Sequence, residues 1–183
     1  MTKYVGRYFY FSAYNYFYKT NSNFEMIDYY TSQGNYGQFA YDSSSSKFYV
    51  ADVHLKKIDV FNESCSLLMS ISLDQEIWAL ALFKRNIYAG FKDSNQILVL
   101  NHGTVIKTVT AYQCYNGTSS ITVDSFGSMA ISCAIPINLV IIYDSDGIYM
   151  NSQILKSSMP WITAIDSSSR LVAMSSESID IYY

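Results

Sequence analysis

Few side chains in the sequence could do chemistry, and most of them lie at the ends of apolar runs. Asp52 and His54 are two residues apart, and Glu76 and Asp93 flank later runs. Carboxylate and imidazole groups bind a divalent cation when several of them converge on one point. We therefore take these four residues as candidate binding residues, with a solvated loop as the alternative. The wider set of such side chains adds Asp74 and Glu177.

No catalytic motif accompanies these residues. The chain contains no GxSxG or HExxH sequence, no P-loop and no Gly-rich dinucleotide fingerprint. We therefore expect no catalytic residues and no dedicated metal site. Trp78 and Trp161 each begin an apolar run and are further candidate binding residues, although packing inside the fold is the favoured interpretation. His102, in the turn "NHGT", is expected to be exposed.

Composition excludes two classes of partner. Half of the 183 residues are hydrophobic, 15% are charged and the net charge is −3, without any cluster of Lys or Arg. Nucleic acid is therefore not an expected partner. Residues 125–143 lack charge over membrane-spanning length, but Pro136 and Asn138 interrupt them, so we expect no membrane insertion. No apolar stretch of a signal peptide follows Met1-Thr2-Lys3.

The sequence repeats itself with a period of 41 or 42 residues. The segments "QFAYDSSSSKFYVAD", "ITVDSFGSMAISCA" and "ITAIDSSSRLVAMSS" each contain an apolar run, Asp-Ser, a polar turn and a second apolar run. The repeated aspartates are Asp42, Asp124 and Asp166, and Phe83 stands in the same place between the first two. A short carboxylate before serine is typical of a turn, so we interpret these aspartates as turn caps.

Each repeat predicts four short strands. Apolar residues alternate within the runs, which is the pattern of half-buried strands, and turn residues separate the runs. Residues 66–82 hold no helical apolar face and are predicted as two strands. The aromatic run "YFYFSAYNYFYK" becomes two strands of the first unit, with its rings between sheets and on an outer strand. The predicted units are 1–30, 37–72, 77–110, 119–155 and 160–183.

Four strands in 40 to 45 residues are typical of a β-propeller blade. The stretches "ITVDSFGSMAIS", "LVIIYDSDG" and "KFYVADVHLKKIDVF" resemble units of NHL-type and related six-bladed propellers. The resemblance implies an all-β propeller of about five four-stranded units, in a single domain over residues 1–183. Two arrangements stay open: a five-bladed ring in which residues 3–5 complete the last unit, or an incomplete arc of a six-bladed ring. An incomplete arc would favour self-association.

The resemblance also implies a choice of functions. Such families include scaffolds, ligand-binding ectodomain modules and lactonase-like hydrolases, and a fold alone does not select among them. We expect a non-catalytic interaction module that binds a protein or glycan through its rim loops, without a cofactor. The alternative is a lactonase-like hydrolase with a divalent cation, such as calcium, at the channel mouth. Enzymatic activity is left open, with a non-enzymatic role favoured.

Cysteines and glycosylation sequons indicate a compartment. In a propeller, Cys114 and Cys133 would reach the same rim, which predicts a disulfide between them; two small buried hydrophobic residues are the alternative. Cys65 is then unpaired. Asn62 and Asn116 begin N-glycosylation sequons in predicted loops. Together these features predict an extracellular protein or ectodomain, and the missing signal peptide argues against it.

Overall fold

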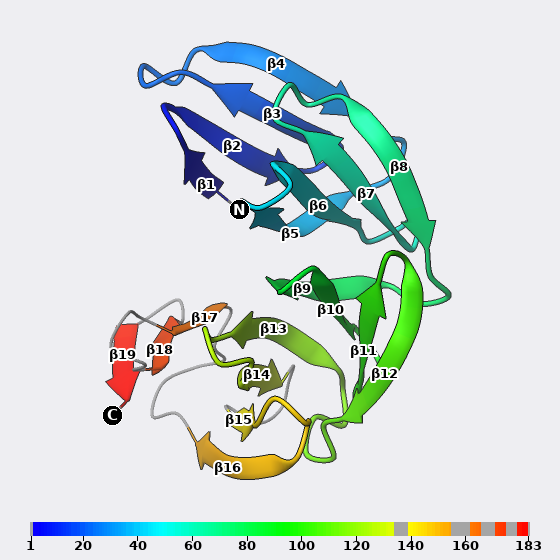
Figure 1. Ribbon diagram of the computed structural model, residues 1–183, viewed down its shortest axis with the longest axis vertical. Helices are drawn as coiled ribbons and strands as arrows, with labels where there is room; N and C mark the ends of the chain where they lie inside the picture. The colour runs from blue at the N-terminus through cyan, green and yellow to red at the C-terminus, as the bar shows by residue number, and fades with distance from the viewer. Residues whose placement is uncertain (1, 134–138, 155–161, 166–170, 175–178, 183) are drawn as a thin grey trace. The chain divides into compact units, whose positions relative to one another are not determined.

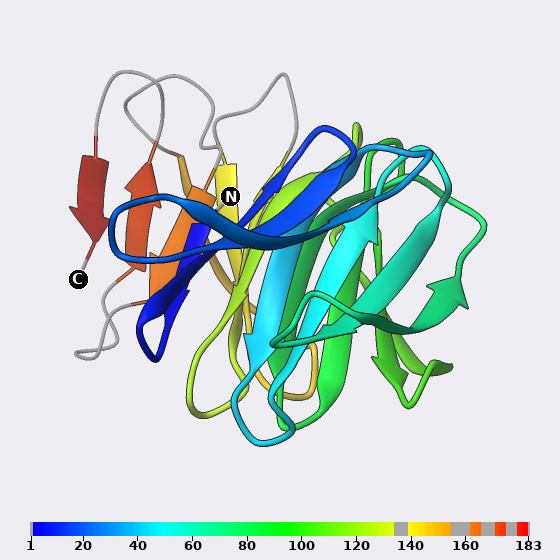
Figure 2. The same ribbon diagram turned by 90° about the horizontal axis from the view of Figure 1, so that it is seen from above.

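The chain is built from β-strands. The computed structural model describes residues 2–133, 139–154, 162–165, 171–174 and 179–182. Within these residues, every regular secondary-structure element is a β-strand (Figure 1). Within these residues there is no helix long and apolar enough to cross a membrane. Contacts divide the chain into two compact units, residues 1–77 and 78–183. Consecutive strands run up and down beside one another in both units (Figures 1 and 2).

The first unit contains two four-stranded antiparallel sheets in chain order. The strands of its first sheet are β1 (Thr2–Val5), β2 (Tyr8–Ala13), β3 (Tyr16–Thr20) and β4 (Met26–Thr31). Those of its second sheet are β5 (Tyr36–Asp42), β6 (Lys47–Asp52), β7 (Lys57–Asn62) and β8 (Leu67–Ser72).

The second unit continues the pattern with two four-stranded sheets and one sheet of three strands. Its first two sheets contain β9 (Ile77–Phe83), β10 (Asn86–Phe91), β11 (Gln96–Asn101), β12 (Thr104–Thr110), and then β13 (Thr118–Val123), β14 (Met129–Cys133), β15 (Leu139–Tyr143) and β16 (Tyr149–Ile154). The third contains β17 (Ile162–Ile165), β18 (Leu171–Met174) and β19 (Ile179–Tyr182). Residues 66–82 contain β8 and all of β9 except its last residue, as predicted.

The repeated aspartates close turns between strands, as their position before serine predicts. Asp42 Oδ1 accepts hydrogen bonds from the backbone N–H and the hydroxyl of Ser44, at 2.9 and 2.7 Å. Asp124 Oδ1 accepts from the N–H groups of Phe126 and Ser128, both at 2.8 Å. Burial raises the pKa of Asp42, but hydrogen bonds from its serines outweigh burial and hold that pKa below its ordinary value. Asp166 lies outside the described residues.

Strand β1 forms a tight hairpin with the next strand. It pairs with β2, from Thr2 opposite Phe11 to Val5 opposite Tyr8. Gly6 makes the intervening turn with a φ of +63°, a backbone conformation that glycine adopts without steric cost. The structure therefore places residues 3–5 in the first sheet, as its first strand in the order β1-β2-β3-β4.

Aromatic residues form the core of the first unit. Tyr10 and Phe17, from the aromatic run, are buried against Phe39, Phe48 and Phe61 of the second sheet. The ring centroid of Phe17 lies 5.0 Å from that of Phe61 and 5.3 Å from that of Phe48. Tyr10 and Phe17 therefore pack between two sheets, as predicted, and Tyr8 is partly buried against them. Tyr14 lies in the β2–β3 turn, and the remaining four rings of the run lie on the opposite face of the first sheet.

Aliphatic residues form the corresponding core of the second unit. Ile97 and Val99 of β11 pack with Ile131 of β14 and Ile141 of β15. This packing joins the first two sheets of the second unit. Phe83, the residue in the place of the repeated aspartate, packs against this core and is only partly buried. Lys84 and Arg85, which follow Phe83, turn the chain with φ angles of +46° and +69°.

Candidate functional site

Four connections meet at one end of the sheets of the first unit, which we call the rim. They are the β2–β3 turn, the β4–β5 connection (residues 32–35), the β6–β7 turn (residues 53–56) and the start of the β8–β9 connection. Backbone hydrogen bonds link them in sequence: Ser32 N–H donates to Asn15 O at 2.8 Å, Val53 N–H to Asn35 O at 2.9 Å, and Leu73 N–H to Lys56 O at 2.8 Å. The loops therefore form one connected surface.

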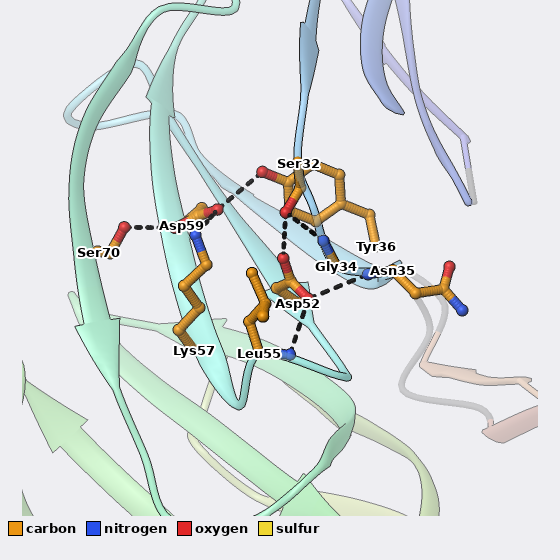
Figure 3. Close-up of polar contacts among 9 residues, drawn as sticks. All are labelled: Ser32, Gly34, Asn35, Tyr36, Asp52, Leu55, Lys57, Asp59 and Ser70. Carbon is orange, nitrogen blue, oxygen red and sulfur yellow. Dashed lines mark hydrogen bonds and ion pairs between the residues drawn. The ribbon is translucent and has the colours of Figure 1, made fainter. Parts of the chain in front are cut away.

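A fully buried carboxylate anchors two of these loops. Asp52, at the end of β6, accepts hydrogen bonds from the Ser32 hydroxyl at 2.5 Å and from the N–H groups of Asn35 and Leu55, both at 3.1 Å (Figure 3). Ser32 Oγ in turn accepts from Gly34 N–H at 2.9 Å. A buried carboxylate needs such donors, because an unpaired one is costly to remove from water. Asp52 is therefore a structural anchor of the rim.

Gly34 shows how tightly the β4–β5 connection approaches this carboxylate. A Cβ atom at position 34 would lie 1.9 Å from Asp52 Oδ1, far inside any allowed contact. The approach is therefore open only to glycine, for reasons of space rather than of backbone angle.

A second buried carboxylate lies one strand away. Asp59 of β7 accepts hydrogen bonds from the Tyr36 hydroxyl at 2.7 Å and the Ser70 hydroxyl at 2.5 Å, and pairs with Lys57 Nζ at 2.8 Å (Figure 3). Burial, and then the hydrogen bond to Asp59, raise the pKa of Tyr36, so its phenol keeps its proton. This cluster joins β5, β7 and β8 beneath the rim and gives the loops above it a fixed base.

The anchored loops carry exposed side chains of mixed chemistry. Tyr14 of the β2–β3 turn is 82% exposed and Leu55 of the β6–β7 turn is 48% exposed. His54 and Lys56 beside Leu55 are also exposed. We call Tyr14, His54, Leu55 and Lys56 the rim patch. It combines an aromatic ring, an aliphatic side chain and basic groups on a backbone that the buried carboxylates hold.

The predicted binding residues do not converge on one point, as the ligands of a cation would. Asp52 is buried and His54 is exposed, so the two face different environments although they are two residues apart. Glu76 is partly buried, and Asp93 is exposed in the second unit. In the part of the chain that the structure describes, no three His, Cys, Asp or Glu residues come together as a metal site. The arrangement gives Asp52 a structural role in place of a metal-binding one.

The two tryptophans and His102 are the remaining residues singled out from the sequence. Trp78 is the second residue of β9 and is 38% exposed, and Lys92 Nζ lies 5.5 Å from its ring centroid. That distance is within the range of a cation–π contact. Trp161 lies outside the described residues. His102 is exposed in the β11–β12 turn with a φ of +49°, in agreement with the prediction.

Sequence reasoning missed Ser32, Gly34 and Tyr14. Ser32 and Gly34 lie against Asp52, which is 18 or more positions later, and no local sequence pattern indicates such a contact. The isolated Gly34 in the polar connection "SQGN" was the available signal, since such a glycine often marks a close approach. Tyr14 breaks the strand pattern inside the aromatic run, with a φ of +51° at the turn.

In the second unit a disulfide occupies the place that Asp52 has in the first. Cys114, in the β12–β13 connection, is bonded to Cys133 at the end of β14, which confirms the predicted pairing. Cys133 stands opposite Thr118, the first residue of β13, just as Asp52 stands opposite Tyr36, the first residue of β5. Both groups therefore join the end of the second strand of a sheet to the connection that precedes that sheet.

A thiol count tests the assignment of all three cysteines. Cys65 is buried in a β7–β8 turn, and burial raises the pKa of its thiol to about 12. The thiolate is the reactive form, so Cys65 is expected to resist a disulfide reagent at pH 8 in the folded protein. We expect no titratable thiol in the native protein, one in denaturant and three in denaturant with prior reduction. A Cys65→Ser variant is the control and should give none until reduction; two or more thiols without reduction would contradict the disulfide.

Comparison with solved structures establishes the fold. The chain is similar to the crystal structure of the WD40 beta propeller domain of Doa1, with a TM-score of 0.81 and 13% sequence identity. The match covers 98% of this chain and 61% of that one, so the chain spans about three fifths of its length. No protein-family model and no curated protein matches the chain. The sheets are therefore blades of a β-propeller, as predicted.

Proposed function

We propose that this β-propeller is a non-catalytic interaction module that binds a protein partner through the rim patch. The observation that carries the proposal is the Asp52 network, which fixes two loops whose outward side chains are exposed. A β-propeller supports such a role, because its loops gather at the ends of a rigid stack of sheets. Loops that are already ordered lose little conformational entropy when a partner binds.

The side chains of the rim patch define the chemistry of the partner. Tyr14 and Leu55 supply apolar area, and aromatic anchors are enriched at protein interfaces. Lys56 and His54 place basic groups beside them in a chain with a net charge of −3. The complementary surface is an apolar side chain flanked by carboxylates, as in an acidic loop or peptide.

Site-specific photocrosslinking tests this surface. A benzophenone amino acid in place of Leu55 is expected to form a discrete crosslinked product in an extract of the source organism. The same group in place of Ser44, in the β5–β6 turn, is the matched exposed control and should not form it. Once the product is identified, Leu55→Ala and Lys56→Glu should each weaken the purified complex by about tenfold or more. Equal labelling from both positions, or unchanged affinity in both variants, would overturn the proposal.

We further propose an extracellular location with a glycan on Asn116. Structural disulfides persist mainly in oxidising compartments, and the Cys114–Cys133 bond is consistent with such a place. Asn116 is exposed two residues after Cys114, whereas Asn62 is only partly exposed at the end of β7.

Expression through a secretory pathway tests both sequons. Fusion to a signal peptide should give a protein whose mass falls on enzymatic deglycosylation. Asn116→Gln should remove most of that difference, and Asn62→Gln should remove little. An unmodified secreted protein would contradict the glycan assignment. A reduced pair of cysteines in protein isolated from its natural source would contradict the location.

NHL-type membership is likewise a proposal. The turn sequences "DSFG" and "DSDG" support it, and Asp144 of the second accepts hydrogen bonds from the N–H groups of Asp146 and Ile148. For the hydrolase alternative with calcium at the channel mouth, the described residues offer no favouring observation. Asp52, the carboxylate it would use, is directed into the Ser32, Asn35 and Leu55 donors.

A further inference from the structure

The outer face of the first sheet is covered with aromatic rings. Cross-strand neighbours place them on one side: Tyr4 stands opposite Phe9, Phe11 opposite Tyr18, and Tyr18 opposite Tyr29. Ring contacts tie them together, with Phe24 stacked on Phe9 at a centroid distance of 5.1 Å. We call this set the aromatic face; its members are Tyr4, Phe9, Phe11, Tyr16, Tyr18, Phe24 and Tyr29.

The aromatic face is large enough to be an interface. Phe24 is 65% exposed, Tyr4 57%, Tyr29 54% and Tyr16 42%. With roughly 200 Å² for each aromatic side chain, these four rings leave about 400 Å² in water, and the three partly buried rings add to it. Monomers rarely expose apolar patches beyond about 300–600 Å², and one partner of a stable complex contributes about 800 Å². The face therefore supplies more than half of such a contribution from its rings alone.

The same sheet shows what kind of surface covers such rings. On its other side, Tyr10 and Phe17 are covered by the four-stranded sheet β5–β8 and its phenylalanines. The aromatic face contains no charged member, so it does not select a partner by charge. A second copy of this chain brings an identical sheet with identical rings, and a two-fold contact places the two faces against each other.

We infer that the aromatic face is a self-association surface, on which two copies of the chain pack sheet against sheet. Burial of both faces removes their rings from water without the cost of burying a charge. The aromatic face shares no residue with the rim patch, so different variants test the two proposals. Phe24 lies at its turn end with a φ of +61°, and its ring covers Phe9 and Phe11.

Sedimentation equilibrium of the full chain tests this inference over about 1 to 500 μM, a range chosen because an interface of this area supports micromolar affinity. A monomer–dimer equilibrium is expected. A monomer at every concentration, or open-ended aggregation without a dimer, would overturn the inference.

Lysine variants locate the contact. Phe24→Lys and Tyr4→Lys should each raise the dimer dissociation constant by at least about 30-fold, since each would bury two unpaired charges per dimer. Phe126→Lys is the matched control, because Phe126 is 74% exposed in the second unit; its dissociation constant should change by less than threefold. Far-UV circular dichroism verifies that each variant is folded. A dimer that survives both lysines in folded protein would overturn the inference.

Discussion

Asp52→Ala is expected to destabilise the first unit by about 3–4 kcal/mol, the range for leaving several buried donors unpaired. The substitution leaves the Ser32 hydroxyl and the N–H groups of Asn35 and Leu55 without their acceptor. The carboxylate and the Ser32 hydroxyl are buried, and the hydrogen bonds from Asn35 and Leu55 are partly buried. Urea unfolding followed by far-UV circular dichroism measures the loss.

Two further variants separate charge from space at this position. Asp52→Asn keeps one carbonyl acceptor and should cost about half as much as alanine, because a single oxygen can still serve part of the network. Asp93→Ala removes an exposed aspartate from the β10–β11 turn and should change stability by less than about 0.5 kcal/mol. Equal stability of Asp52→Ala and Asp93→Ala would show that the buried network does not hold the rim.

Phe17→Ala is expected to cost about 3–5 kcal/mol, as large-to-small substitutions of buried rings do. Phe17 is fully buried, and its ring lies within 6.1 Å, centroid to centroid, of Tyr10, Phe39, Phe48 and Phe61. Removing it leaves a cavity among rigid rings, which cannot collapse to fill the space. Because Trp78 and Trp161 are both in the second unit, tyrosine near-UV circular dichroism is the better signal for this change.

The controls for Phe17 separate packing from loss of any phenylalanine. Phe17→Leu should cost about 1–1.5 kcal/mol, since it retains most of the volume. Phe126→Ala removes an exposed ring and should be close to neutral. A loss below about 1 kcal/mol for Phe17→Ala would mean that the two sheets of the first unit do not pack as described.

Local chemistry explains why much of the fold could be predicted from the sequence. Alternating apolar residues place Ile58 and Val60 in a strand, and Asp42, Asp124 and Asp144 mark turns because each bonds the backbone two to four residues away. The Cys114–Cys133 pairing followed from the same register. Such signals lie within a few residues of one another, or repeat with the period of the blades.

The candidate site could be predicted only in part, because its contacts are distant in sequence. Asp52 was predicted as a binding residue, and its structural role depends on the donors Ser32 and Asn35, which lie 20 and 17 positions earlier. When these donors are not known, a carboxylate two residues from a histidine suggests a metal site. The sequence left open whether residues 3–5 belong to the first or the last unit, because so short a strand carries little pattern; the pairing with β2 is seen only in the structure. The exposure of Tyr4 and Phe24 could not be predicted either, because it is set by which residues pack on the outer face of the first sheet.

Amide hydrogen exchange tests the central claim, that buried Asp52 holds the rim loops in a fixed conformation. The N–H groups of Asn35 and Leu55 should exchange as slowly as those of β6 and β7, and far more slowly than those of residues 43–45 in the exposed β5–β6 turn. Exchange of Asn35 and Leu55 at the rate of that turn would contradict the claim and would remove the physical basis for a preformed rim patch.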